Sequence, residues 1–182
     1  MTSQPKMARP MEVIRRRRMQ LLTTRGYLSL ALRILVITLA IWLIFTNVFL
    51  LSQCSDLGMF PAIEAGDLLL AYRLQDEYVK GDVVIYTVDG ARYLGRIVAR
   101  ETDLVQLDDS GNLIVNGTTQ GGEIMYPTYA KEGIHYPLTI PQDTLFILGD
   151  YRTQTQDSRD FGPIPLKNIE GKVITIVRRR GL

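Results

Sequence analysis

The sequence has very few of the residues that build disulfides, zinc centres and histidine-dependent active sites. Its 182 residues include one cysteine, Cys54, and one histidine, His135. A single cysteine excludes a disulfide within the chain, and the two residues together exclude a cysteine/histidine zinc centre. No G-x-S-x-G motif is present, and His135 lies in a loop rich in Tyr and Pro, so a histidine-based triad is disfavoured. We therefore expect no metal and no cofactor, and a fold that rests on packing.

Positive charge is scarce outside the N-terminal segment. Residues 1–33 hold eight of the 21 Lys and Arg residues against Glu12 alone, so this segment carries +7 and the remainder −5. A basic leader is typical of a topology signal, and nothing downstream offers the basic face that nucleic acid requires. We therefore expect no nucleic-acid partner.

One long uncharged run interrupts the sequence between residues 34 and 51. With residues before Arg33 included, it is long enough to span a bilayer. Arginines precede the run, whereas acidic residues follow it, so the positive-inside rule places the N-terminus in the cytoplasm. The sequence thus predicts a cytoplasmic basic segment at 1–27, a single transmembrane helix at 28–52 in the cell membrane, and an extracytoplasmic domain at 53–182.

Two processing events compete with a permanent anchor. A cleaved signal peptide has a shorter apolar core and a small-residue cleavage site, which this segment does not clearly offer. The stretch Leu51 to Cys54 is similar to a lipoprotein box, in which Cys54 would carry lipid, but Gln53 stands where a small residue is expected. We favour the uncleaved anchor.

Short β-type runs separated by turn signals follow the anchor. They predict strands at 68–73, 83–88, 93–100, 104–107, 113–115, 144–148 and 173–178. Residues 108–112 have the composition of a hairpin loop. The stretch 120–141, rich in Gly, Tyr and Pro, predicts an insertion or long loop. The expected fold class is mainly β, and the low cysteine content fits the exterior of a Gram-positive cell.

Four ordered blocks carry a resemblance to a known family. They are residues 58–67, which are similar to S-M-x-P-T-L followed by x-G-D; residues 80–86, similar to G-D-[IV]-V-x-F; residues 93–98, similar to Y-[IV]-K-R-[VI]-[IV]; and residues 149–164, similar to G-D-N-x-x-x-S-x-D-S-R-x-[WF]-G-x-[VI]. In this order, with the distinctive D-S-R-x-F-G element, they resemble type I signal peptidase, a membrane-anchored Ser/Lys protease. The resemblance implies a signal-peptidase-type β-domain.

The departures from this family fall at its catalytic positions. The resemblance places Gly58 at the nucleophile and Gly95 at the lysine general base, and glycine supplies neither group. Asp56 stands at an oxyanion-hole position, where its charge would oppose a developing oxyanion. Thr155 keeps the hydroxyl of a supporting serine. From these positions we expect a catalytically degenerate homologue with no peptidase activity.

Other positions of the resemblance are kept, and they suggest a domain that still binds peptide. Asp157 and Arg159 are expected to form a supporting ion pair, the alternative being exposed loop charges. The resemblance assigns a peptide groove that draws in an extended chain by strand pairing to Met59, Phe60, Pro61 and Ile63, for which core packing is the competing interpretation.

The leading functional hypothesis is a chaperone-like accessory protein. In it the chain binds secreted or pilin polypeptides and assists sortase-dependent pilus assembly at a Gram-positive membrane, as the resemblance implies. The first alternative is an active signal peptidase with a relocated dyad, for which Cys54, Ser55 and the outer lysines are the available groups. The second is a regulator of signal-peptide processing.

Overall fold

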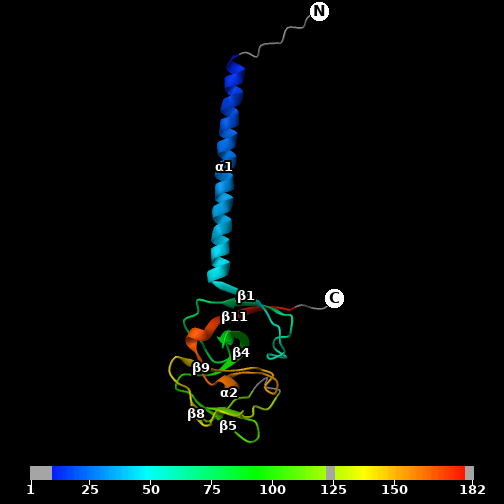
Figure 1. Ribbon diagram of the computed structural model, residues 1–182, viewed down its shortest axis with the longest axis vertical. Helices are drawn as coiled ribbons and strands as arrows, with labels where there is room; N and C mark the ends of the chain where they lie inside the picture. The colour runs from blue at the N-terminus through cyan, green and yellow to red at the C-terminus, as the bar shows by residue number, and fades with distance from the viewer. Residues whose placement is uncertain (1–9, 122–125, 179–182) are drawn as a thin grey trace, which may run out of the picture. The chain divides into compact units, whose positions relative to one another are not determined.

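A computed structural model describes residues 10–121 and 126–178, and for residues 10–22 it describes the backbone alone. The chain divides into two units, residues 1–44 and 45–182 (Figure 1). The predictions for the first nine residues lie outside the described part. We describe each unit separately.

The described part of the N-terminal unit is helical, and its helix α1 runs from Pro10 to Asn47, three residues past the boundary at residue 44. Its stretch Thr23–Asn47 is long and apolar enough to cross a membrane, because 25 residues at 1.5 Å each span about 37 Å against a hydrocarbon core of about 30 Å. The side chain of Thr38 donates back to the carbonyl of Ile34 at 3.0 Å, so this polar group has a partner inside the helix. The helix therefore has the length and the composition of a single-pass membrane anchor.

The helix ends earlier than the sequence indicated. Residues Phe49–Gln53, of which 49–52 fall within the expected transmembrane helix 28–52, form strand β1 instead. They pair antiparallel with β2 (Leu68–Tyr72), from Phe49 opposite Tyr72 to Gln53 opposite Leu68. Strand pairing satisfies the backbone groups of these residues, and a run of apolar residues does not distinguish the two structures. The helix boundary is corrected to Asn47.

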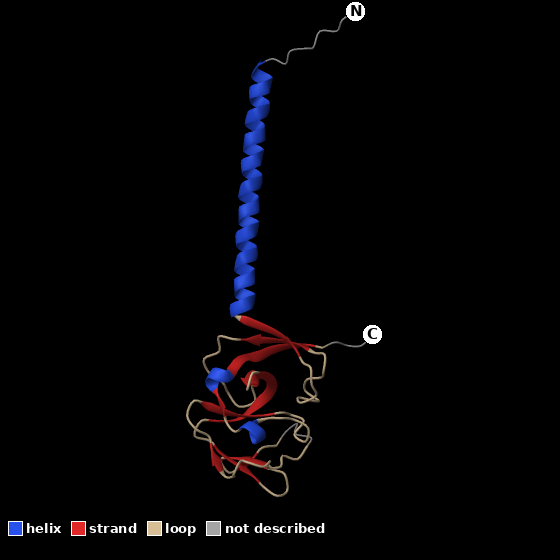
Figure 2. Cartoon of the chain, in the orientation of Figure 1, coloured by secondary structure: helices blue, strands red, loops and turns tan. Residues whose placement is uncertain are grey.

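Over the residues that the structure describes, the second unit is a β-domain with two sheets (Figure 2). The large sheet has seven strands in the order β1-β2-β11-β3-β4-β9-β10, and the small one has four in the order β7-β6-β5-β8, all pairs antiparallel. The strands not yet bounded are β3 (Val83–Val88), β4 (Ala91–Arg100), β5 (Leu104–Leu107), β6 (Leu113–Val115), β7 (Thr118–Thr119), β8 (Leu138–Thr139), β9 (Thr144–Leu148), β10 (Ile164–Pro165) and β11 (Ile169–Val177). The predicted mainly β fold with one N-terminal apolar helix is confirmed.

Two short helical turns connect the last strands. Helix α2 covers Ser158–Phe161, and a 3-10 turn covers Leu166–Asn168. Asp157 caps α2, because its side chain accepts from the Arg159 N–H while Asp160 accepts from the N–H of Asp157. This cap fixes the chain direction at the start of α2.

Separate apolar clusters hold the sheets together. One contains Phe146 and Leu148 of β9 together with Val105 and Val115 of the small sheet, and so joins the two sheets. Strands β5 and β8 lie at the opposite end of the domain from β1 and β11 (Figure 1). Strand β8 belongs to the predicted insertion 120–141, so part of that stretch completes the small sheet, and residues 122–125 lie outside the described part.

Candidate active site

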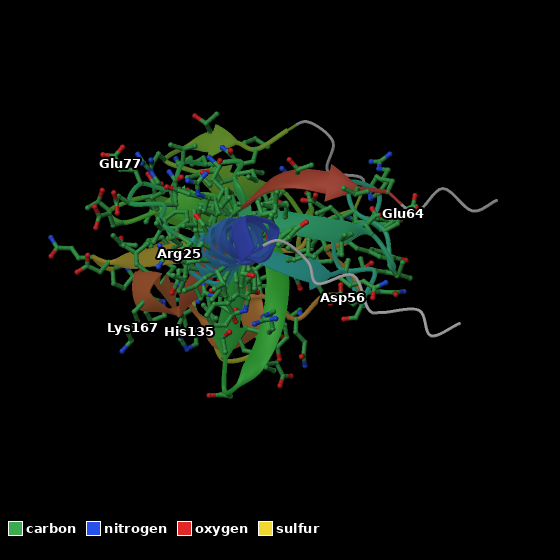
Figure 3. The ribbon with its side chains drawn as sticks, turned by 90° about the horizontal axis from the view of Figure 1, so that it is seen from above. Arg25, Asp56, Glu64, Glu77, His135 and Lys167 are labelled. Carbon is green, nitrogen blue, oxygen red and sulfur yellow. The ribbon has the colours of Figure 1, made fainter. Side chains whose placement is uncertain are left out.

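A pocket of about 490 Å³ lies beside Gly58. Three segments far apart in sequence form it: the connection from β1 to β2, the start of β4, and the loop before α2. We call it the hydroxyl pocket, and its lining residues are Ser55, Asp56, Leu57, Gly58, Tyr93, Leu94, Gln154, Thr155 and Gln156. Figure 3 shows Asp56 on the same side of the β-domain as Glu64, whereas His135 lies toward another side. Three of the four sequence blocks therefore meet at this pocket.

The backbone of Gly58 is held on both of its polar groups. Its N–H donates to Oδ1 of Asp56 at 2.9 Å, and its carbonyl accepts from the N–H of Tyr151 at 3.0 Å. A side chain at this position would begin 3.0 Å from the methyl carbon of Thr155 and 3.1 Å from Oδ1 of Asp56. The carboxylate of Asp56 therefore already accepts the hydrogen bond of the backbone N–H that the resemblance assigns to an oxyanion hole.

Gly95 lies buried in the middle of β4, opposite Val84 of β3. A Cβ here would stand 2.6 Å from Cγ2 of Ile147 and 3.2 Å from the carbonyl of Leu148. Such contacts require the neighbours to move. Its neighbour Leu94 lines the hydroxyl pocket, whereas Gly95 does not. The structure thus leaves little room for a longer side chain at this predicted base position.

Behind the pocket, Asp157 accepts hydrogen bonds from five donors. Arg159 provides three of them, Nε at 2.9 Å, Nη2 at 2.7 Å and the backbone N–H at 3.0 Å. Gly149 N–H and Thr155 Oγ1 donate at 3.2 and 2.9 Å. Both members of the ion pair are about 2% exposed or less. Paired with five donors, this buried carboxylate fixes the loop that forms one wall of the pocket.

Lys131 also reaches this wall, from the stretch predicted as an insertion. Its Nζ lies 2.5 Å from the carbonyl oxygen of Thr155 and 2.6 Å from Oδ2 of Asp160. These two acceptors fix the position of the Lys131 side chain against the wall. No local sequence signal marks this contact, because Lys131 and Thr155 are 24 positions apart.

The four residues predicted for a peptide groove separate into two groups. Met59 and Ile63 have no exposed surface and pack in the core with Cys54 and Leu69. The structure therefore places these two in the core instead of on a groove wall. Phe60 is half-buried with its ring 6.3 Å from that of Tyr151, and Pro61 is exposed. Phe60 and Pro61 alone remain available at the surface.

These observations define a two-sheet β-domain with one pocket at the meeting point of three sequence blocks, and an N-terminal apolar helix precedes it in the sequence. The sequence model described as "Signal peptidase, peptidase S26" matches residues 27–178. The chain therefore belongs to the signal peptidase family, peptidase S26. This match covers the β-domain and the residues that line the hydroxyl pocket.

Named relatives agree with this family. The chain is 32% identical over 133 residues to the probable thylakoidal processing peptidase 2 of Arabidopsis thaliana, a match that covers 64% of this chain and 35% of the relative. It is 30% identical over 129 residues to a signal peptidase I of Bacillus licheniformis, covering 63% of this chain and 68% of that protein. The chain thus spans about a third of the length of the plant relative.

A solved structure also resembles the chain. It is a signal peptidase I of Enterococcus faecalis, with a TM-score of 0.47 and 23% identity, and the match covers 55% of this chain and 98% of the other.

The comparisons correct one expectation from the sequence. We expected an inactive homologue that is not an enzyme, because Gly58 and Gly95 stand at the predicted catalytic positions. That expectation is wrong: the relatives are named as peptidases, and the family match extends across both glycines. The assignment of those two positions to a nucleophile and a base stays a prediction.

Proposed function

We propose that this chain is a signal peptidase that binds exported polypeptides at the membrane surface and cleaves them. Helix α1 would anchor it with the N-terminus in the cytoplasm and the β-domain outside. The family match and the names of the relatives support this proposal. The structural observation that carries it is the hydroxyl pocket, where Ser55 and Thr155 stand beside Gly58.

Within this proposal Ser55 is the nucleophile. It is exposed, it lines the pocket, and it lies three residues before Gly58. The hydroxyl of Thr155 is a poorer candidate because it is buried and donates to Asp157. Asp56 is the carboxylate in the same pocket lining that would accept the proton from Ser55. This pair is a relocated dyad in which a carboxylate takes the place of the outer lysines that the sequence offered as partners of Ser55.

The test is cleavage of a preprotein with an A-x-A site by the full chain in nanodiscs. S55A is expected to lower the cleavage rate by roughly 10⁴-fold or more, as loss of a nucleophile does in serine proteases. S110A is the matched control, because Ser110 is an exposed serine in the 108–112 loop. Cleavage that survives S55A but disappears in T155V would move the nucleophile to Thr155, and cleavage by neither wild type nor variants would refute the proposal.

A second candidate function is the holding of a secreted or pilin chain during pilus assembly, with a sortase as a further partner. The close packing around Gly95 favours it, because the position assigned to the family's base has no room for a lysine without rearrangement. In this role the hydroxyl pocket retains the bound chain and presents it for polymerisation.

Deletion in the cell distinguishes this role from cleavage and from control of processing. Loss of cleavage leaves precursors uncut, whereas loss of the assembly role leaves them cut but unpolymerised. A regulator of signal-peptide processing predicts faster processing on deletion. Capture of pilin subunits and sortase with the full chain from wild-type envelopes would support the assembly role, and normal pili in the deletion strain would exclude it.

A further inference from the structure

Helix α1 carries a charged residue inside its apolar stretch. Arg33 is exposed and lies within Thr23–Asn47, the part of the helix that is long and apolar enough to cross a membrane. Basic residues at the cytoplasmic end of an anchor are ordinary, but a cation well inside the stretch is costly to bury in hydrocarbon. Arg33 therefore needs a partner or a route out of the hydrocarbon.

The membrane stretch offers Arg33 no counter-ion. Thr23–Asn47 contains no Asp or Glu, and Arg25 is its only other charged residue. Arg33 takes part in none of the ion pairs among the described residues. A second copy of the same stretch would bring no carboxylate either. The compensating anion therefore comes from outside this stretch.

The end of the helix limits the depth at which Arg33 can lie. Strand β1 follows at Phe49 and is an edge strand of the large sheet as described. A bilayer core excludes an open strand edge, because lipid tails offer its backbone groups no hydrogen bonds, so the core ends near Asn47. Residues 34–47 rise only about 21 Å, against a core of about 30 Å. The Cα of Arg33 thus lies about 9 Å inside the opposite edge of the core.

The direction of helical side chains gives the guanidinium of Arg33 a route to that edge. Side chains of an α-helix point toward its N-terminus, which is the direction of the nearer edge. An arginine stem lies along apolar surface and carries its head about 6 Å in this direction. About 3 Å remain, and local thinning of the bilayer closes this distance at a much smaller cost than a buried cation.

The helix surface on this side of Arg33 leaves space for a lipid headgroup. Ser29 and Gly26 lie within about 40° of Arg33 around the helix axis. Both are exposed, and a Cβ added at Gly26 would meet no described residue within 4 Å. The anion that phospholipid headgroups hold nearest to the core is a phosphate, and a guanidinium fork matches it with two parallel hydrogen bonds.

We infer that Arg33 binds the phosphate of a phospholipid in the leaflet on the N-terminal side of the helix, and that this contact sets the depth of the anchor. Under the proposed function this is the cytoplasmic leaflet, and only that assignment rests on the proposed function. Strand β1 begins two positions after the helix ends, so the same contact fixes the level at which the chain leaves the membrane.

The single tryptophan of the chain measures this depth. Trp42 is exposed on α1, and brominated phospholipids quench its fluorescence according to its depth when the full chain is reconstituted in vesicles. In wild type, residues 34–47 and the reach of Arg33 together span about 27 Å, which places Trp42 about 6 Å from the bilayer midplane. R33L leaves residues 26–47 uncharged over about 33 Å, so Trp42 is expected to move about 3 Å farther from the midplane. Equal depths in wild type and R33L would overturn the inference.

Two further variants separate charge from other effects of the substitution. R25L is the matched control, because it removes an arginine from the same stretch but leaves Arg33 in place, so the depth of Trp42 should not change. R33K restores the charge and should keep the wild-type depth, since lysine also reaches the interface. A shift in R25L or in R33K as large as that in R33L would overturn the inference.

The lipid composition tests the phosphate itself. The R33L shift should be smaller in vesicles of a brominated, phosphate-free galactolipid than in phospholipid vesicles, and equal shifts would refute phosphate as the ligand. The purified vesicles contain no other protein, so a shift confined to native membranes would assign Arg33 to a partner's carboxylate and overturn the inference. The depth of Trp42 is measured without substrate, so a failure of cleavage in the S55A test leaves it unaffected, and an unchanged depth leaves the proposed cleavage unaffected.

Discussion

Replacing Asp157 with asparagine tests the network behind the hydroxyl pocket most directly. Asparagine keeps the size of the side chain but removes its charge, and Arg159 stays buried at 2% exposure without a counter-ion. Of the five hydrogen bonds to Asp157, the two from Nε and Nη2 of Arg159 depend most on that charge. Breaking a buried ion pair on one side costs about 3–5 kcal/mol, so we expect D157N to lower the free energy of unfolding by that amount.

The assay is thermal and urea unfolding of the full chain in detergent, followed by near-UV circular dichroism of the tyrosines. Trp42, the single tryptophan, lies in α1 and does not report on the β-domain. The expected change corresponds to a fall in Tm of roughly 10–20 °C for a domain of this size.

E170Q is the matched control for D157N. Glu170 also accepts two hydrogen bonds from one arginine, Nε of Arg92 at 3.0 Å and Nη2 at 2.6 Å, but Arg92 is about half exposed. Exposed pairs contribute about 1 kcal/mol or less. Equal destabilisation by D157N and E170Q would refute the reasoning, because burial would then make no difference to the ion pair.

Three further predictions concern packing, pH and the pocket wall. G95A should lower the free energy of unfolding by about 1–3 kcal/mol, because the added Cβ stands 2.6 Å from Cγ2 of Ile147. Urea unfolding of the same preparation measures this change. The hydrogen bonds from Arg92 lower the pKa of Glu170. The ionised Glu170 therefore stabilises the folded chain fully above about pH 5, and this contribution is lost as the pH falls through the lowered pKa. The difference in Tm between wild type and E170Q should shrink over that acidic range. K131M should increase hydrogen exchange at residues 154–156, since it removes the lysine bond to this wall.

Each of these has a control and a contradicting result. G121A adds a methyl group that has no described residue within 4 Å, and equal costs for G121A and G95A would disprove the packing argument. A wild-type and E170Q difference that persists unchanged at pH 3 would contradict the pKa direction. K167M is the control for K131M, because Lys167 is exposed and lies outside the hydroxyl pocket. Similar hydrogen exchange at residues 154–156 in both variants would contradict a role of Lys131 in ordering the pocket wall.

The sequence predicted most of the large sheet, because the alternation of apolar and polar residues and the turn residues between the runs both depend on local structure. Strands Val83–Val88 and Thr144–Leu148 match their predicted bounds. Strand Phe49–Gln53 was hidden because its apolar residues continue the composition of the helix, and the pairing with β2 decides its structure. Helix α2 was missed because four residues carry no period, although Asp157 and Asp160 have the spacing of a capping box.

The candidate site was predictable to a smaller extent. Asp56, Gly58 and Thr155, which the resemblance assigns to one site, line one pocket, and their roles stay predictions. It did not separate the core residue Met59 from the surface residue Pro61, because both are apolar and close in sequence. The contacts of Lys131 and Arg152 join residues more than twenty positions apart. They form only in the folded chain, so no local sequence pattern predicts them.

The convergence of five donors on Asp157 also has a consequence for the entropy of binding. The donors come from Gly149, Thr155 and Arg159, so the segment that includes the pocket wall is already ordered before any polypeptide arrives. A wall that is fixed in advance loses little conformational freedom on binding, so more of the contact energy with an extended chain appears as affinity. One buried carboxylate thereby makes a short surface loop behave as a rigid template.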